Sequence, residues 1–438
     1  MFSQATMNVL AALVTVLTFA AIVRKVEVRL ALLTGGLVMA ALSLNPQAWS
    51  DAFAKNMTVG GLLVVIPPVM GFAAVMEITG CNAHLVKLLT DPLLKVRAFL
   101  IPGAMLVTWF INMALSSAAG CTAAVGVVLI PAMMAAGIHP AMAAAAVFAG
   151  TWGSVWSPGN PHNAVVAKIA NVQVMDVILA HRVASFTGAF LIAAILFTEG
   201  KLFHQDRDWT PERAGSDLDQ IAGARKDKLE RVNLLRALIP VVPLLILLLT
   251  NVEFVTAALP WLPKRVSVLV AMMIGTGLGM LVTWTSPVKI SNEFFRGMGH
   301  AYGFVFGIII AAGAFIGGLE AAGVLKGLIE LLKTAQSSVP LAGTFGPFLL
   351  AVLGGSGDAA TLAFNNAVTP HAAQFGIGTV NLGNLANIGG ALGRSMSPVA
   401  AGCIIAAGFA GVNPFEITKR NLIPMLVAAV AVMLILGR

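Results

Sequence analysis

Two charged side chains, Asp358 and Arg394, lie inside long apolar stretches of this sequence. Asp358 belongs to Leu-Gly-Gly-Ser-Gly-Asp-Ala-Ala (353–360), and Arg394 to Leu-Gly-Arg-Ser-Met-Ser-Pro (392–398). A charge at membrane depth costs about 2.5–3.5 kcal/mol on insertion scales and usually faces a partner or a watery cavity. A carboxylate suits a coupling proton or sodium ion, and the planar fork of an arginine suits a substrate carboxylate. The alternative is a structural pair between the two residues, and the sequence leaves both interpretations open.

Both charges lie beside breaks that recur along the chain. Three features repeat at a shift of 240 residues: Ser116 with Ser356, Ser157-Pro158 with Ser397-Pro398, and Asp176 with Glu416. Glu77-x-x-Gly80 and Glu320-x-x-Gly323 match at 243. Repetition at one shift in similar contexts predicts two related halves. Asp358 corresponds to Ala118 and Arg394 to Ser154, so both charges are peculiar to the second half.

Breaks of this kind expose groups that bind ions. A half-helix that begins inside the membrane presents unpaired N–H groups and a partial positive charge, which favour a carboxylate. The prolines enforce the interruptions because they remove a donor and push the preceding residue out of the helix. The predicted substrate site therefore gathers Ser116, Ser117, Ser157, Asn160, Ser356, Gly357, Asp358, Arg394 and Ser397. A site for sodium or a proton is predicted at Asp358, Ser356 and Ser116.

Each of these residues also has a purely structural interpretation. Small residues in membrane helices often only permit close packing, and Asn160 can serve as a helix cap. We interpret His162 as structural rather than as a proton carrier. Lys168 is expected to extend its amine toward the membrane surface.

The composition predicts an all-α polytopic membrane protein. Of 438 residues, 58% are hydrophobic and only 11% charged, whereas soluble proteins have about 25% charged residues. Runs of about 17–22 apolar residues are long enough to cross a bilayer core as helices. The expected spans are 7–23, 28–44, 59–76, 97–137, 139–170, 183–199, 237–253, 265–285, 300–322, 340–376, 378–410 and 421–437.

Four of these spans are interrupted, which defines the expected topology. Runs 97–137 and 340–376 are predicted to be re-entrant hairpins, because a Gly/Ser-rich break at membrane depth must be buried or line a cavity. Runs 139–170 and 378–410 are predicted to be broken crossings. Each half, 1–199 and 237–438, then has five crossings, and this odd number inverts the second half relative to the first.

The basic residues suggest an orientation. In this topology 18 of the 27 Lys and Arg residues fall in loops on one side and 7 on the other, so the richer side is cytoplasmic. Both termini are then external, and the hydrophilic linker 200–236 is cytoplasmic. Basic residues follow the first span instead of preceding it, so we expect a retained helix and not a cleaved signal peptide.

Several functions are disfavoured. Three cysteines without CxxC spacing predict neither a disulfide framework nor a zinc site. The net charge of +8 follows from the topology and does not indicate nucleic-acid binding. No phosphate-binding loop and no Ser-His-Asp or metal cluster accompanies the breaks, which argues against an enzyme and against ATP-driven transport by this chain alone. No cofactor is expected beyond a coupling ion.

Four motifs resemble those of a known family, the anaerobic four-carbon dicarboxylate uptake carriers of the C type, within the ion transporter superfamily. They are Ala-Leu-Ser-Ser-Ala-Ala-Gly (114–120), Gly-Gly-Ser-Gly-Asp-Ala-Ala (354–360), Leu-Gly-Arg-x-x-Ser-Pro (392–398) and Asn-Pro-Phe-Glu-x-x-Lys-Arg (413–420). The resemblance extends from about residue 60 to 438. It implies a homodimeric carrier of succinate, fumarate or malate in a bacterial inner membrane, in which a transport domain moves as an elevator. A sodium/proton antiporter on the same scaffold is the alternative.

Overall fold

The structure is a computed structural model, and it describes residues 4–24, 26–58, 60–96, 99–207, 231–251, 263, 266–323 and 336–438. All regular structure in these residues is helical. Among them, five helices are long and apolar enough to cross a membrane, or seven if each of two bent pairs forms one span. The prediction of an all-α polytopic membrane protein is therefore confirmed. Residues 208–230 of the linker lie outside the described part.

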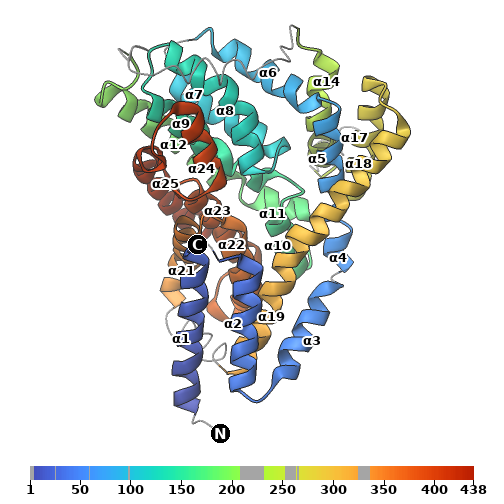
Figure 1. Cartoon of the computed structure of the whole chain (residues 1–438), viewed down its shortest axis with the longest axis vertical. Helices are drawn as coiled ribbons and strands as arrows, with labels where there is room; N and C mark the ends of the chain where they lie inside the picture. The colour runs from blue at the N-terminus through green and yellow to red at the C-terminus, as the bar shows by residue number, and fades with distance from the viewer. Residues whose placement is uncertain are drawn as a thin grey trace.

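The first half contains the helices shown from blue to green in Figure 1. They are α1 (Gln4–Val23), α2 (Val28–Leu42), α3 (Pro46–Met57), α4 (Gly60–Leu63), α5 (Ile66–Ile78), α6 (Cys81–Leu93), α7 (Leu100–Ala114), α8 (Ala118–Ala135), α9 (Pro140–Ala149), the 3-10 helix η2 (Gly150–Trp156), α10 (Pro161–Ala170), α11 (Val174–Ala180) and α12 (Arg182–Leu202).

The second half continues from yellow-green to red. It contains α14 (Leu234–Leu238), η4 (Ile239–Val241), α15 (Val242–Asn251), α17 (Val268–Thr283), α18 (Pro287–His300), η5 (Ala301–Phe306), α19 (Gly307–Ala321), η6 (Gln336–Ser338), α21 (Val339–Gly354), α22 (Gly357–Ala367), η7 (Thr369–Phe375), α23 (Thr379–Arg394), α24 (Ala401–Ala410) and α25 (Pro414–Leu436).

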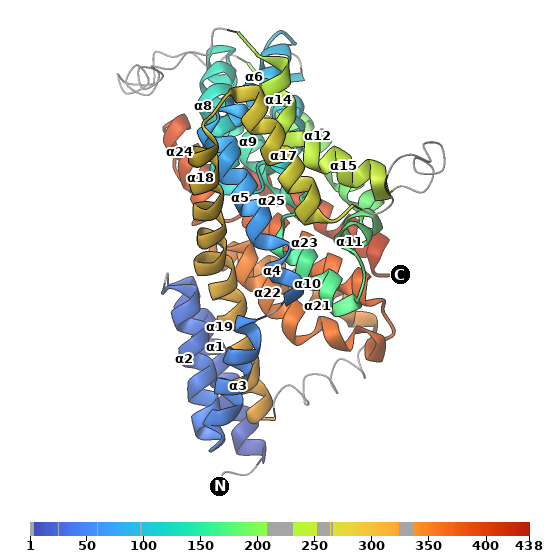
Figure 2. The ribbon, with the colours of Figure 1, turned by 90° about the vertical axis from the view of Figure 1, so that its right-hand side faces the viewer.

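Three helices, α3, α6 and α18, were not predicted as separate elements, because each carries polar residues that interrupt an apolar run. The polar residues of α18 recur every three or four positions, as in Lys289, Glu293 and Arg296, and so line one helix face. The helix continues through η5 and α19 to Ala321, over 35 residues. At 1.5 Å per residue it is about 50 Å long, and the predicted span 300–322 covers only its second part. Figure 2 shows it running along most of the molecule.

One group of helices packs in a reciprocal manner between the halves. Helix α19 packs against α2 and α3, while α5 packs against α17 and α18. Glycines allow this contact: a Cβ on Gly36 would lie 2.7 Å from the Cα of Phe315, and one on Gly297 would lie 2.4 Å from the carbonyl oxygen of Met70. At the shift of 243 residues α2, α3 and α5 correspond to α17, α18 and α19.

The second group surrounds the predicted breaks. Helix α7 packs against η2, α21 against α23, α8 against α24, and α22 against α10. At the shift of 240 residues α7 corresponds to α21, α8 to α22 and η7, α10 to α24, and α11 to the start of α25. The boundaries agree within a few residues, so the repeated sequence features coincide with repeated elements.

Close packing of η2 on α7 leads to a stability prediction. A Cβ on Gly153 would lie 1.9 Å from the carbonyl oxygen of Trp109, and a backbone atom cannot move away as a flexible side chain can. We expect Gly153→Ala to lower the free energy of unfolding by about 1–3 kcal/mol or more, measured as the unfolding midpoint in detergent. The control is Gly277→Ala in α17, where a Cβ meets no atom within 4 Å. Equal midpoints for the two variants would contradict the packing argument.

Candidate functional site

The first hairpin break lies between α7 and α8 and opens onto a cavity. Ser117 is the N-cap of α8, where its Oγ accepts a hydrogen bond from the N–H of Gly120 at 3.1 Å. Ser116 and Ser117 line a cavity of about 1010 Å³ that α5, α6 and α18 also border. Charged side chains line the same cavity, including Glu77 and Arg296. The first break therefore borders a cavity that charged side chains also line.

The second hairpin break lies between α21 and α22, and glycines bring it into contact with neighbouring backbone. Gly355 has a φ of 73°, which favours glycine, and a Cβ there would lie 3.0 Å from the backbone of Val399. A Cβ on Gly357 would lie 2.8 Å from the carbonyl oxygen of Gly390. Gly357 thus lets the start of α22 lie directly on α23. Ser356 occupies the N-cap position of α22 without a side-chain capping hydrogen bond.

Asp358, Arg394 and His162 form a charged cluster, which we call the 358–394 cluster. The Oδ1 atom of Asp358 lies 3.2 Å from Nε2 of His162 and 3.9 Å from Nη1 of Arg394. Asp358 and Arg394 are thus close enough for an ion pair but too far apart for a hydrogen bond. The side chain of Asp358 is 39% exposed, that of Arg394 12% and that of His162 2%.

Arg394 connects the two halves. It is the last residue of α23, and its Nη2 donates a hydrogen bond of 2.7 Å to the carbonyl oxygen of Thr151 in η2. Its Nε has no hydrogen-bond partner among the described residues. A guanidinium has five N–H donors, so most of those of Arg394 have no acceptor among the described residues.

The break of the first broken helix is held by its own polar groups. Asn160 caps α10, because its Oδ1 accepts from the N–H of His162 at 3.0 Å, and its Nδ2 donates to the carbonyl oxygen of Ser154 at 3.1 Å. The carbonyl oxygen of Ser157 accepts from Nδ2 of Asn163 at 3.1 Å. Asn160 therefore positions His162, and both Ser157 and Asn160 are buried.

The second break differs in detail. Its backbone turns between Ser395 and Ala400, and Ser397 is fully buried. The Oγ atom of Ser397 has no hydrogen-bond partner in the part of the chain that the structure describes. Ser395 contributes to the contact between halves, since its Oγ lies 3.3 Å from Oγ1 of Thr151.

A chain of hydrogen-bonded, buried asparagine side chains, which includes Asn163 next to His162 in the sequence, was not predicted from the sequence. Asn387 donates to Oδ1 of Asn163 at 3.2 Å and accepts from Asn365 at 2.8 Å, and Thr369 donates to Asn365 at 2.8 Å. These bonds join α10, α22, η7 and α23. The signal was available, because asparagines inside apolar helices need partners, but partners 22 and 224 residues away cannot be read from spacing.

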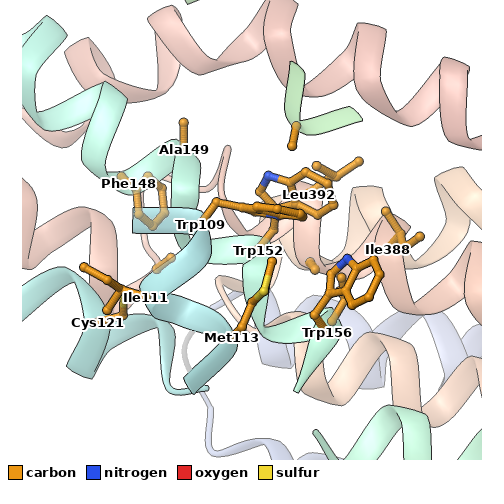
Figure 3. Packing of buried hydrophobic residues seen from close by; sticks show 14 of the residues in the cluster. Trp109, Ile111, Met113, Cys121, Phe148, Ala149, Trp152, Trp156, Ile388 and Leu392 are labelled. Carbon is orange, nitrogen blue, oxygen red and sulfur yellow. The ribbon is translucent and has the colours of Figure 1, made fainter. Parts of the chain in front are cut away.

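Aromatic rings of α7 and α12 pack against the tryptophans of η2. Figure 3 shows Trp109, Trp152 and Trp156 packed together. The rings of Trp109 and Trp152 have centroids 5.6 Å apart, and the ring of Trp156 lies tilted by 59° against that of Phe186 of α12, with centroids 5.2 Å apart. The two tryptophans of η2 thus anchor the segment whose Thr151 carbonyl receives Arg394.

The structure brings together only part of the predicted site. Gly357, Asp358 and Arg394 meet directly, and Asn160 is linked to them through His162. Among the described residues, no side-chain hydrogen bond or ion pair joins Ser116, Ser117, Ser356 or Ser397 to the cluster. The backbone N–H of Ser397 does donate to the carbonyl oxygen of Arg394 at 3.0 Å. The described residues also contain no group of three or more His, Cys, Asp or Glu side chains that could hold a metal ion.

Several apolar helices, interrupted by breaks, are the structure expected of a multi-pass membrane protein. The family model described as C4-dicarboxylate anaerobic carrier (DcuC) matches residues 9–437. The chain therefore belongs to the DcuC family, a family of transporters and not of enzymes, as its motifs suggested.

Individual relatives agree with this assignment. The anaerobic C4-dicarboxylate transporter DcuC of Escherichia coli is 27% identical over 382 residues, which cover 85% of this chain and 80% of that protein. An uncharacterized transporter of Haemophilus influenzae is 39% identical over 274 residues, which cover 62% of this chain and 96% of that protein. A second from the same organism is 49% identical over 136 residues, 31% of this chain and 94% of that protein.

Proposed function

We propose that this protein is a secondary active transporter of four-carbon dicarboxylates such as succinate, fumarate and malate in a bacterial inner membrane. The observation that carries the proposal is Arg394. It is a nearly buried arginine at the end of a half-helix, with most of its donors unused, in a member of a family whose named relatives carry C4-dicarboxylates.

In this proposal Arg394 binds one substrate carboxylate through its planar fork. The Thr151 carbonyl holds Nη2, which fixes the orientation of the guanidinium before the substrate arrives. Half-helix N-termini supply further N–H groups. Ser116, Ser117, Ser157, Ser356, Gly357 and Ser397 complete the site, and Asn160 sets the geometry of the break.

The proposed transport mechanism uses two inverted repeats, 1–199 and 237–438. The hairpins α7–α8 and α21–α22 are taken as re-entrant, and the helices that contain α10 and α24 as broken crossings. The group around the breaks moves as an elevator against the group formed by α2, α3, α5 and α17–α19, in a homodimer. Matching element boundaries and reciprocal packing support the repeats. Both termini are assigned to the external side and the linker 200–236 to the cytoplasm.

Transport is coupled to protons or sodium or works by exchange. The alternative, sodium/proton antiport with Asp358 as the exchanging group, is less well supported, because the named relatives are dicarboxylate carriers and Arg394 already faces Asp358.

The test is uptake of labelled succinate into proteoliposomes, with sodium and pH gradients imposed separately. The proposal predicts saturable uptake that unlabelled fumarate and malate inhibit and that butyrate does not. Absence of carboxylate uptake together with sodium-dependent proton efflux would favour the antiporter.

A further inference from the structure

His162 is a buried polar residue that the proposed function does not use. Its side chain is 2% exposed, and its Nε2 lies 3.2 Å from Oδ1 of Asp358. Neither Nδ1 nor Nε2 has a partner with hydrogen-bond geometry within the described residues, so the contact with Asp358 is a close ion-pair distance. Buried His181 also has an unpartnered ring nitrogen, Nε2, but its Nδ1 lies 2.7 Å from the hydroxyl oxygen of Ser185. Within the part of the chain that the structure describes, the polar contact of the His162 imidazole is with a carboxylate, that of Asp358, which lies beside Arg394.

We propose that His162 binds the proton that couples transport, and that its charge determines whether Asp358 or the substrate occupies Arg394. The inference rests on the proposed function and assigns the coupling ion to a residue. It departs from the structural role that the sequence suggested for His162.

His162 and Arg394 both face the same oxygen atom, Oδ1 of Asp358, and this shared contact explains how proton binding and substrate binding are coupled. When His162 is neutral, Arg394 is the cation that contacts Asp358 among the described residues, and the carboxylate competes with a substrate anion for the guanidinium. When His162 is protonated, the imidazolium neutralises the negative charge of Asp358. Its Nε2 lies 3.2 Å from Oδ1 of Asp358, whereas Nη1 of Arg394 lies 3.9 Å from the same atom. Arg394 is then free for the substrate. Proton and dicarboxylate therefore favour each other's binding, and linkage makes the effect reciprocal.

A proton fits this place better than a sodium ion. Sodium prefers hard oxygen ligands, and an imidazole nitrogen and a guanidinium are poor neighbours for it. The Oδ1 atom of Asp358 already faces both. Histidine is also the side chain that ordinarily changes its charge between about pH 5 and 8.

Protons reach His162 through Asp358. The imidazole is buried, whereas the carboxylate is the most exposed member of the cluster at 39%. A proton from water binds Asp358 and passes to Nε2 of His162, and it leaves by the same route on the other side of the membrane. No covalent bond other than N–H and O–H changes in this step.

Other titratable groups on the helices around α10 have different partners. The elements that pack against α10 are α4, α11, α22, α23 and η7. Apart from Asp358 and Arg394, their charged or titratable residues are Asp176, which accepts from the N–H of Gln173 at 3.0 Å, and His371, which lies 3.4 Å from Gln374. On α10 itself, Lys168 lies in the last turn, at the opposite end from His162.

The experiment measures binding of fumarate to the purified protein and proton uptake on binding. Fumarate is chosen because both of its carboxyl groups stay ionised over the range tested. In the wild type we expect uptake of about one proton per fumarate, and an affinity that weakens by up to about tenfold per pH unit as the pH rises through the titration range of the cluster.

His162→Gln keeps an amide near Asp358 but cannot hold the extra proton. We expect no proton uptake and a weak affinity independent of pH, while fumarate counterflow without ion gradients persists. The matched control is His181→Gln: His181 is also fully buried but bonds Ser185 at 2.7 Å, away from the cluster. The control should keep the wild-type proton uptake and pH dependence.

The outcomes separate the two proposals. If the wild type neither binds fumarate nor performs counterflow, the proposed function fails. If it binds without proton uptake, or if His162→Gln keeps the wild-type proton uptake, the function stands and the inference about His162 is overturned. If His162→Gln does not fold, proton uptake on fumarate binding is measured for the wild type and for His162→Asn instead, and the same two outcomes test the inference about His162.

Discussion

Arg394→Lys is expected to abolish measurable succinate uptake at micromolar concentrations. A lysine offers one point charge, so it cannot hold the Thr151 carbonyl and grip a carboxylate with two parallel bonds, as the guanidinium can. Loss of one charge-assisted hydrogen bond costs about 1.5–3 kcal/mol, which raises the substrate Kd about 10–100-fold. The measurement is initial uptake into proteoliposomes over a range of succinate concentrations.

Arg182→Lys is the matched control, because Arg182 is an exposed arginine whose Nη1 also donates to a backbone carbonyl, that of Leu179 at 2.8 Å. Its KM should be unchanged. An Arg394→Lys protein with near-normal substrate affinity would show that Arg394 only stabilises the contact between α23 and η2.

Asp358→Asn is expected to uncouple transport without weakening substrate binding. The variant removes the anion that competes for Arg394, so affinity should equal or exceed that of the wild type. It also removes the charge that holds a proton on His162, because a buried imidazolium beside Arg394 would have no counter-ion. A pH gradient of one unit, which can drive about tenfold accumulation by a one-proton symporter, should then drive none.

The effects of the two cluster variants differ in sign: affinity is high at all pH values in Asp358→Asn and low at all pH values in His162→Gln. Asp51→Asn serves as the control, since Asp51 is exposed on α3 and contacts Gln47. An unchanged dependence of uptake on the pH gradient in Asp358→Asn would contradict the coupling account.

The sequence predicted the breaks well, because Gly, Ser and Pro act locally. The predicted hairpin break 114–120 contains the observed break between α7 and α8, and 354–360 contains that between α21 and α22. Ser157-Pro158 lies between η2 and α10, as expected. Backbone conformation at such residues depends on φ, ψ and missing donors, which neighbouring residues determine.

The contacts between breaks could not be predicted in the same way. His162 and Asp358 are separated by 196 positions and meet only because α10 packs against α22. The sequence left open whether Asp358 and Arg394 interact. The observed distance of 3.9 Å between Oδ1 of Asp358 and Nη1 of Arg394 depends on how closely Gly357 lets α22 approach α23. Asn163 and Asn387 likewise become partners through packing alone.

Amphipathic helices were missed for a different reason. Hydropathy identifies segments surrounded by lipid, but α3 and α18 use their apolar faces against α19 and α5 of the other half. Charged residues at i, i+4 and i+7 on α18 lower the mean hydropathy without breaking the helix.

The measurement that tests the central claim most directly is equilibrium binding of succinate to the purified wild-type protein by titration calorimetry, with butyrate as the four-carbon monocarboxylate control. We predict saturable binding of about one succinate per chain, and no saturable binding of butyrate, because a single carboxylate cannot engage both Arg394 and the half-helix N-termini. Equal binding of succinate and butyrate, or no saturable binding of succinate, would contradict a dicarboxylate site at Arg394.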